Sequence, residues 1–345
     1  MLLYSFVYAE IIDIEKKPTV EKVSQSVKEN DVKFIAETSL SAAQWDPGVS
    51  LINDTNQKLL DYNTEGLNLY SIKGKINIFD SDVLTIEKYG SFAGTSSQKE
   101  LVSNYKKDMS EDSALEGLNI SVKAFLLLKH FYLKDYKYLE ALEYQYSTYK
   151  FSAVAKNTID TIFWYGPTTE GIIEKDFFPL SKDSTISFFT DFNEHRLYVL
   201  ELVDLVKSLP IDSIKVGAYS TNWLKPTYLG STDKTTGKPI IHHSEFISHG
   251  ITFDIMHKFL DKVDIGFSLN YGFDNYINYT SNSLEVDYLS YDTYLNFSQN
   301  IYSAKLFEIY AHAKAFMSMK RFNSSGHDLN SEDVKGVSVG LNVVF

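Results

Sequence analysis

Apolar and polar residues alternate with a period of two over most of the chain from residue 32 onward. This period is typical of a β-strand that has one apolar and one polar face, because successive side chains of a strand point to opposite sides. Twelve segments follow the pattern and are predicted to be strands: 32–44, 65–79, 82–92, 116–130, 135–155, 185–206, 212–224, 247–260, 262–275, 284–299, 302–320 and 333–345.

The connections between these segments alternate in length. Short ones are expected at 80–82, 133–135, 210–212, 261–262 and 300–301, and longer ones at 45–64, 93–115, 156–184, 225–246 and 321–332, with a brief one near Ser281. Surface helices are expected only at 19–29 and 97–110. Transmembrane barrels have short periplasmic turns, longer external loops and an even number of strands. The pattern therefore predicts an all-β fold, a transmembrane antiparallel up-and-down β-barrel of about 12 strands.

The two faces of the strands differ in the way that such a barrel requires. In 302–320, Ala311, Ala313 and Ala315 share one face, and His312 and Lys314 share the other. Most segments exceed the roughly 9–11 residues that a tilted strand needs to cross a bilayer. The apolar face is expected toward lipid, and Tyr and Phe near strand ends could form interfacial girdles, as at Tyr89, Tyr138, Tyr276 and Phe322. A soluble barrel with its apolar face inward would alternate in the same way.

Composition excludes several classes of protein. No run approaches ~18 uncharged apolar residues, which a transmembrane helix needs. The chain has no Cys, so disulfides and cysteine-based metal sites are impossible. A net charge of -12 argues against nucleic acid as a partner, because phosphates need a basic surface. The 24 Tyr and 23 Phe fit a fold made of many strands.

The last nine residues read Val337-Ser338-Val339-Gly340-Leu341-Asn342-Val343-Val344-Phe345. This ending resembles the assembly signal of Gram-negative outer-membrane β-barrel proteins, with Ser338, Gly340, Val343 and Phe345 in the places of its polar residue, glycine, hydrophobe and terminal aromatic. The resemblance implies that the barrel-assembly machinery recognises the last strand, and that the protein lies in outer-membrane lipid. Gly340 would also ease strong twist or a close backbone approach.

The N-terminal part is predicted to lie outside the barrel. Residues 1–9 read as the apolar end of a secretory signal peptide, with Val7-Tyr8-Ala9 as a small-x-small cleavage site, although the basic region that usually precedes it is missing. Residues 10–31 would form a periplasmic segment and residues 32–345 the barrel.

Two groups of polar residues that contain histidine are candidates for a catalytic or metal site. His242 and Ser244 match the His-x-Ser element of outer-membrane phospholipases, but the glycine-rich sequence and the orienting Asn of that family are missing. His242, His243 and His249 could instead hold a metal, and the simpler interpretation is a polar external loop. The polar group Asp191, Glu194 and His195 is interpreted as the start of a strand. We therefore predict no catalytic residue, no metal and no cofactor.

The charged faces of the strands are the remaining functional signal. They predict a pore-lining set of Lys73, Lys75, Glu87, Lys123, Glu143, Lys215, Asp254, Asp292, Glu308, His312 and Lys314. Three functions stay open: a porin-like channel for small hydrophilic solutes, a barrel-borne lipid hydrolase, and a structural or surface-interaction barrel with a plugged lumen. A channel would gain selectivity if lysines on one wall faced acidic residues on the other.

Overall fold

The computed structural model describes residues 32–52, 58–78, 81–92, 99–100, 110–125, 132–133, 136–139, 141–156, 161–162, 166–167, 173–174, 180–181, 185–203, 211–232, 235, 239–259, 262–278, 283–324, 327–328 and 331–345. The predicted segments 1–9 and 10–31, including the helix expected at 19–29, lie outside these residues. No helix among the described residues is long and apolar enough to cross a membrane.

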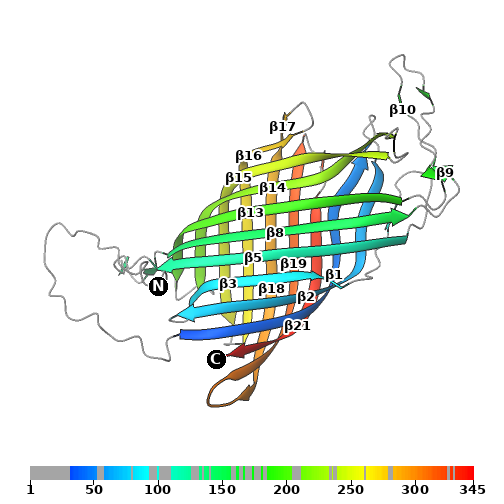
Figure 1. The fold of residues 1–345 in the computed structure, drawn as a ribbon. Helices are drawn as coiled ribbons and strands as arrows, with labels where there is room; N and C mark the ends of the chain where they lie inside the picture. Colours follow the sequence, from blue (N-terminus) through cyan, green and yellow to red (C-terminus); the bar gives the residue numbers. More distant parts are fainter. Residues whose placement is uncertain are drawn as a thin grey trace.

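Twelve antiparallel strands form a closed barrel, which confirms the predicted fold (Figure 1). The strands are β1 (Val32–Ile52), β2 (Lys58–Ile78), β3 (Ser81–Ser91), β5 (Ser110–Phe125), β8 (Ala141–Lys156), β13 (Thr185–Val203), β14 (Ser213–Thr232), β15 (Pro239–Phe259), β16 (Val263–Asn278), β18 (Asp287–Ser303), β19 (Glu308–Ser324) and β21 (Glu332–Val344). Each pairs with the next in this order, and β21 pairs with β1 from Ile35↔Val344 to Asp46↔Asp333, which closes the ring.

The described residues also include nine short strands between the barrel strands. They are β4 (Lys99–Glu100), β6 (Tyr132–Leu133), β7 (Tyr136–Leu139), β9 (Thr161–Ile162), β10 (Gly166–Pro167), β11 (Ile173–Glu174), β12 (Leu180–Ser181), β17 (Ser283–Glu285) and β20 (His327–Asp328). Because β4 pairs with β2, Lys99 and Glu100 are not helical, and the helix predicted at 97–110 is wrong at these residues.

The two ends of the barrel differ less in connection length than predicted. We call the end that carries Val32, Val344 and the connections 79–80, 126–140, 204–212, 260–262 and 304–307 the turn end. The loop end carries 53–57, 92–109, 157–184, 233–238, 279–286 and 325–331. The long connections 92–109 and 157–184 are where they were expected. The connection 126–140 is longer than expected, because β6 and β7 form a small hairpin within it.

Strands β1, β2, β14 and β15 extend farther toward the loop end than predicted. Beyond the predicted ends of two of these strands stand Pro47 and Pro226, and proline cannot donate to a strand ladder. The structure places both prolines beside register shifts, which lie between Trp45 and Val49 in β1 and after Pro226 in β14. A bulge tolerates proline because its residues do not need the regular pairing, so these strands continue beyond it.

The outer surface of the barrel is apolar. Ala313 is exposed on this surface whereas His312 is buried inside, as predicted from the alternation. Large apolar side chains are exposed on most of the barrel strands, among them Phe34, Leu40, Ile72, Ile86, Val122, Leu142, Leu197, Ile251, Phe267, Phe273, Leu295, Phe297, Val337, Val339 and Leu341.

Two inward-facing glycines allow a neighbouring ring to cross their strand. A Cβ on Gly117 would collide with the ring of Tyr89, and a Cβ on Gly340 would collide with the ring of His312 and the backbone oxygen of Thr38. The close backbone approach expected at Gly340 is therefore present, and it seats His312 against the wall of the lumen.

Candidate functional site

The lumen holds a cavity of about 740 Å³ in the half of the barrel nearer the turn end. Its lining includes Lys75, Asp82 and Asn342 from the turn-end portions of β2, β3 and β21. Trp45 and Phe192 line it at its other end. This cavity is the candidate functional site, because it is a concave space with converging polar groups.

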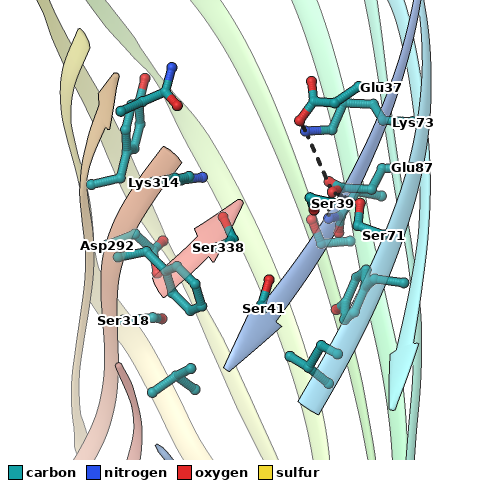
Figure 2. Close-up of a pocket in the computed structure, with 18 of the residues that line it drawn as sticks. Glu37, Ser39, Ser41, Ser71, Lys73, Glu87, Asp292, Lys314, Ser318 and Ser338 are labelled. Carbon is teal, nitrogen blue, oxygen red and sulfur yellow. Dashed lines mark hydrogen bonds and ion pairs between the residues drawn. The ribbon is translucent and has the colours of Figure 1, made fainter. Parts of the chain in front are cut away.

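Ion pairs on one wall of the cavity fix its charged side chains. The ammonium of Lys73 lies 3.3 Å from the carboxylate of Glu37 and 3.5 Å from that of Glu87 (Figure 2). Ser71 donates a hydrogen bond of 2.6 Å to Glu87. Lys75 is paired with Asp82 at 3.0 Å. These residues lie on neighbouring strands, so the registers of β1, β2 and β3 bring them together.

A second network surrounds Arg196 on β13. Its guanidinium lies 2.7 Å from Glu194, 3.3 Å from Asp292 and 3.9 Å from Asp254, and it donates a hydrogen bond of 2.8 Å to Ser268. The network joins β13 to β15, β16 and β18. Because the guanidinium presents several donors in a fixed plane, one arginine can hold acidic residues from several strands.

Most of the predicted pore-lining residues point into the lumen. Lys73, Lys75, Glu87, Asp292, His312 and Lys314 line the cavity. Nearer its edges, Lys215 pairs with Glu143 at 2.6 Å, Lys123 pairs with Glu201, and Asp254 belongs to the Arg196 network. Glu308 accepts a hydrogen bond of 2.5 Å from Tyr310. Their role in lining a conducting pore stays a prediction.

The lysines do not form a wall that faces a separate acidic wall. Each of these lysines has an acidic partner within 4 Å. Lys73 pairs with Glu37 on β1 and with Glu87 on β3. Lys75 pairs with Asp82 on β3, and Lys123 pairs with Glu201 on β13. The condition named for a selective channel, lysines on one wall facing acidic residues on the other, is therefore not met at these three lysines. Unpaired buried charges are costly, so the fold provides a partner for each.

An apolar layer crosses the lumen near the loop end. Its buried members are Trp45, Leu67, Leu115, Tyr149, Phe151, Phe192, Tyr219, Trp223, Phe246, Ile277, Val286, Tyr288 and Phe322, with Leu69, Tyr89 and Val334 packed against them. Every one of the twelve barrel strands contributes to this layer. Tyr89 and Phe322 point inward here, so their predicted place in an outer girdle is wrong.

Rings in this layer touch across the lumen. The ring centroids of Trp223 and Phe322 are 6.1 Å apart although β14 and β19 are separated by four steps around the barrel. Trp45 and Phe151 meet edge to face at 4.7 Å across the same number of steps, from β1 to β8. Trp223 and Phe322 are both 0% exposed. Side chains from strands that are not neighbours in the ring are therefore in contact inside the lumen at this layer.

A buried ion pair holds the apolar layer together. The ammonium of Lys320 lies 2.5 Å from the carboxylate of Glu332, and Tyr149 donates a hydrogen bond to the same carboxylate from the far wall. The ammonium of Lys320 also lies 4.5 Å from the ring centroid of Phe192. These contacts connect β19 and β21 to β8 and β13.

Sequence reasoning missed several inward charges, including Arg196, Glu194, Glu37, Lys320 and Glu332. The alternation of side chains along a strand could have identified some of them, because Glu194 and Arg196 are two residues apart and therefore share a face. Asp191, Glu194 and His195, interpreted as the start of a strand, lie within β13 and do not share one face. Asp191 pairs with Lys150, and His195 lies 2.7 Å from the hydroxyl of Tyr144, both on the opposite face to Glu194.

The histidine-rich segment does not gather its side chains. His243 stacks on Phe189 at 4.3 Å between ring centroids, while Ser244 is buried on the opposite face of β15. His249 is six residues farther along the strand, which corresponds to roughly 20 Å. Among the described residues no group of three or more metal-binding side chains is present.

No protein-family model matches the chain, and no curated protein sequence matches it either. Solved outer-membrane barrels resemble its fold. The protease OmpT from Escherichia coli has 12% identity and a TM-score of 0.31, over 94% of this chain and 99% of that chain. The translocator domain of the autotransporter NalP from Neisseria meningitidis has 8% identity and a TM-score of 0.35, over 93% and 91%. A FadL homologue from Pseudomonas aeruginosa has 9% identity and a TM-score of 0.30, over 92% and 90%.

These resemblances are too distant to carry an argument about function. The neighbours are a protease, a translocator domain and a FadL homologue, and what they share with this chain is the barrel fold.

Proposed function

We propose that this protein is an outer-membrane β-barrel whose lumen is plugged, so that it acts as a structural or interaction barrel and not as a permanently open porin. The observation that carries the proposal is the apolar layer, to which all twelve barrel strands contribute. The same proposal places the turn end in the periplasm and the loop end outside, as in barrels with this arrangement of termini.

The outer surface supports insertion in lipid. Phe273 is 68% exposed, Ile72 is 61% exposed and Val339 is 60% exposed. Burying apolar surface is worth about 25 cal/mol per Å², so a ring of such side chains in water would be strongly unfavourable. The backbone of the barrel supports it too, because closure satisfies the strand edges that lipid could not.

The position of the C-terminal strand supports recognition by the barrel-assembly machinery. Phe345 is 60% exposed on the outer surface, and its backbone exchanges hydrogen bonds of 2.9 and 3.3 Å with Phe34. The C-terminal strand therefore meets the first strand at the seam that closes last in chain order. A recognition signal at this place would be displayed on the strand that completes the barrel.

A second candidate is a gated channel for small hydrophilic solutes. The charged cavity of about 740 Å³ favours it, because a polar space of this size is available on the turn-end side. Passage would require the apolar layer to move. The hydrolase alternative gains no support from the sequence, because nucleophilic catalysis needs a third group that orients the histidine, and no Asn lies between Ser244 and Asn270.

Retention of small solutes by proteoliposomes tests the plug. Vesicles that contain the wild-type protein should retain trapped sucrose as well as protein-free vesicles do. A variant with Trp45→Ala, Trp223→Ala and Phe322→Ala removes three rings that meet across the lumen, and it should release sucrose. Rapid release by the wild type would overturn the proposal and favour the channel.

The matched control changes the outer surface. Phe267→Ala and Leu295→Ala remove large side chains that are exposed to lipid, so they should leave retention unchanged. All variants should show heat-modifiable migration, which reports a folded barrel. Release by the outer-surface control as well would show that leakage follows from general loosening and not from the loss of the plug.

A further inference from the structure

Lys314 differs from the lysines of the lumen that form ion pairs. Lys73, Lys75, Lys215 and Lys320 each have a carboxylate oxygen within 4 Å. The ammonium of Lys314 instead lies 4.6 Å from the ring centroid of Tyr294. Within the described residues no carboxylate is close enough to form an ion pair with it.

The fold keeps the nearby acids occupied. Glu37 and Glu87 are held by Lys73 on the facing wall, and Asp292 is held by Arg196. Figure 2 shows Lys314 on one side of the cavity and Lys73 with its acidic partners on the other. A lysine whose ammonium is directed into a cavity without a close counter-ion is suited to receive an anion, since a charge-assisted contact would compensate it.

Serine hydroxyls line the same cavity as Lys314. Ser39 and Ser41 on β1, Ser318 on β19 and Ser338 on β21 all line the cavity (Figure 2). Their side chains make no hydrogen bond to another described residue. A hydroxyl can donate one hydrogen bond and accept two, so these four groups can bind hydroxyls of a ligand in either sense.

We propose that this cavity binds a small organic anion that carries hydroxyl groups, with its anionic group on Lys314 and its hydroxyls on the serines. The volume of about 740 Å³ lies in the range of small-molecule sites. A neutral polyol would leave Lys314 without a counter-ion, and a cation beside Lys314 would be repelled by its ammonium. The inference goes beyond the plugged barrel and does not depend on it, because a cavity in the lumen can bind a ligand whether or not the lumen conducts.

Calorimetric titration of the purified, detergent-solubilised barrel at low ionic strength tests the proposal. The probe is D-gluconate, which has one carboxylate and several hydroxyls; D-glucose is the neutral probe and acetate the probe without hydroxyls. Saturable binding of gluconate is expected, with glucose and acetate each weaker by about tenfold or more. Binding should weaken further as salt is added, because screening increases.

Variants assign the binding to Lys314. Lys314→Gln should weaken gluconate binding by about tenfold or more, whereas Lys314→Arg should restore most of it. Lys305→Gln removes the same charge from the exposed turn before β19 and should leave binding unchanged. Ser318→Leu, which keeps Lys314 but fills the hydroxyl side of the cavity, should also weaken binding and serves if Lys314→Gln fails to fold.

Several results would overturn the proposal. They are the absence of saturable gluconate binding by the folded wild type, equal affinity of Lys314→Gln and wild type, and glucose binding as tight as gluconate. Acetate binding as tight as gluconate would overturn the role of the serines. A leaking wild-type barrel that still binds gluconate through Lys314 would refute the plug and leave this inference standing, so the two failures can be told apart.

Discussion

The ion pair between Lys320 and Glu332 gives the sharpest test of how the apolar layer is held. Only 12% of the Lys320 side chain and 2% of the Glu332 side chain are exposed. Lys320→Met keeps a long flexible side chain at this position but removes the ammonium. It leaves the carboxylate of Glu332 buried, with Tyr149 as its remaining donor.

The magnitude follows from this burial. Removing one partner of a buried ion pair costs about 3–5 kcal/mol, because the remaining charge is buried without compensation. The contact of the ammonium with the Phe192 ring adds about 0.5–2 kcal/mol. Lys320→Met should therefore lower the free energy of unfolding by roughly 3 kcal/mol or more. The double variant Lys320→Met with Glu332→Gln removes both charges, and it should be more stable than Lys320→Met alone.

Reversible urea unfolding in lipid vesicles measures the free energy of unfolding of Lys320→Met and of the double variant. Tryptophan fluorescence reports the layer directly, because Trp45 and Trp223 belong to it. A positive coupling between the two substitutions is the expected outcome of the double-mutant cycle. The reasoning is refuted if Lys320→Met unfolds within about 1 kcal/mol of the wild type, or if Glu332→Gln makes the Lys320→Met protein less stable still.

Three further outcomes are expected. Deleting Phe345 should reduce the amount of heat-modifiable barrel in the outer membrane, and normal levels would count against its role in assembly. Ala315 lies at the middle of β19 on the lipid side, so Ala315→Lys should lower the free energy of unfolding by about 2–4 kcal/mol. Ser318→Lys on the lumen side should lower it by less. The reverse order in urea unfolding would contradict the assignment of faces. Lys73→Gln leaves two acidic neighbours without their cation, so it should lower the unfolding midpoint, and an unchanged midpoint would show that these ion pairs do not stabilise the wall.

The strands could be predicted from the sequence because the period of two is a local property. Each of the twelve barrel strands corresponds to one predicted segment, and the inward and outward assignments of His312 and Ala313 are correct. The strand ends were harder to predict. Strands β1 and β14 continue past Pro47 and Pro226 because they stay paired with their neighbours, and this pairing is not a local property of the sequence.

The arrangement inside the lumen could be predicted only in part. Alternation tells which side chains point inward, but the partners of a side chain across the lumen depend on how the ring closes. Trp223 and Phe322 meet because β14 and β19 lie across the lumen from each other, and no local pattern relates positions so far apart in the sequence. The inward position of Arg196 follows from the alternation, but most of its partners could not be predicted, since they come from β15 and β18 as well as from its own strand β13.

Current through a planar bilayer tests the plugged lumen most directly. After insertion of the folded wild-type protein, the account predicts a membrane without stepwise conductance at moderate voltage, and discrete conductance steps for the variant with Trp45→Ala, Trp223→Ala and Phe322→Ala. Stable conductance steps from the wild-type protein, of the same size as those of the variant, would contradict it.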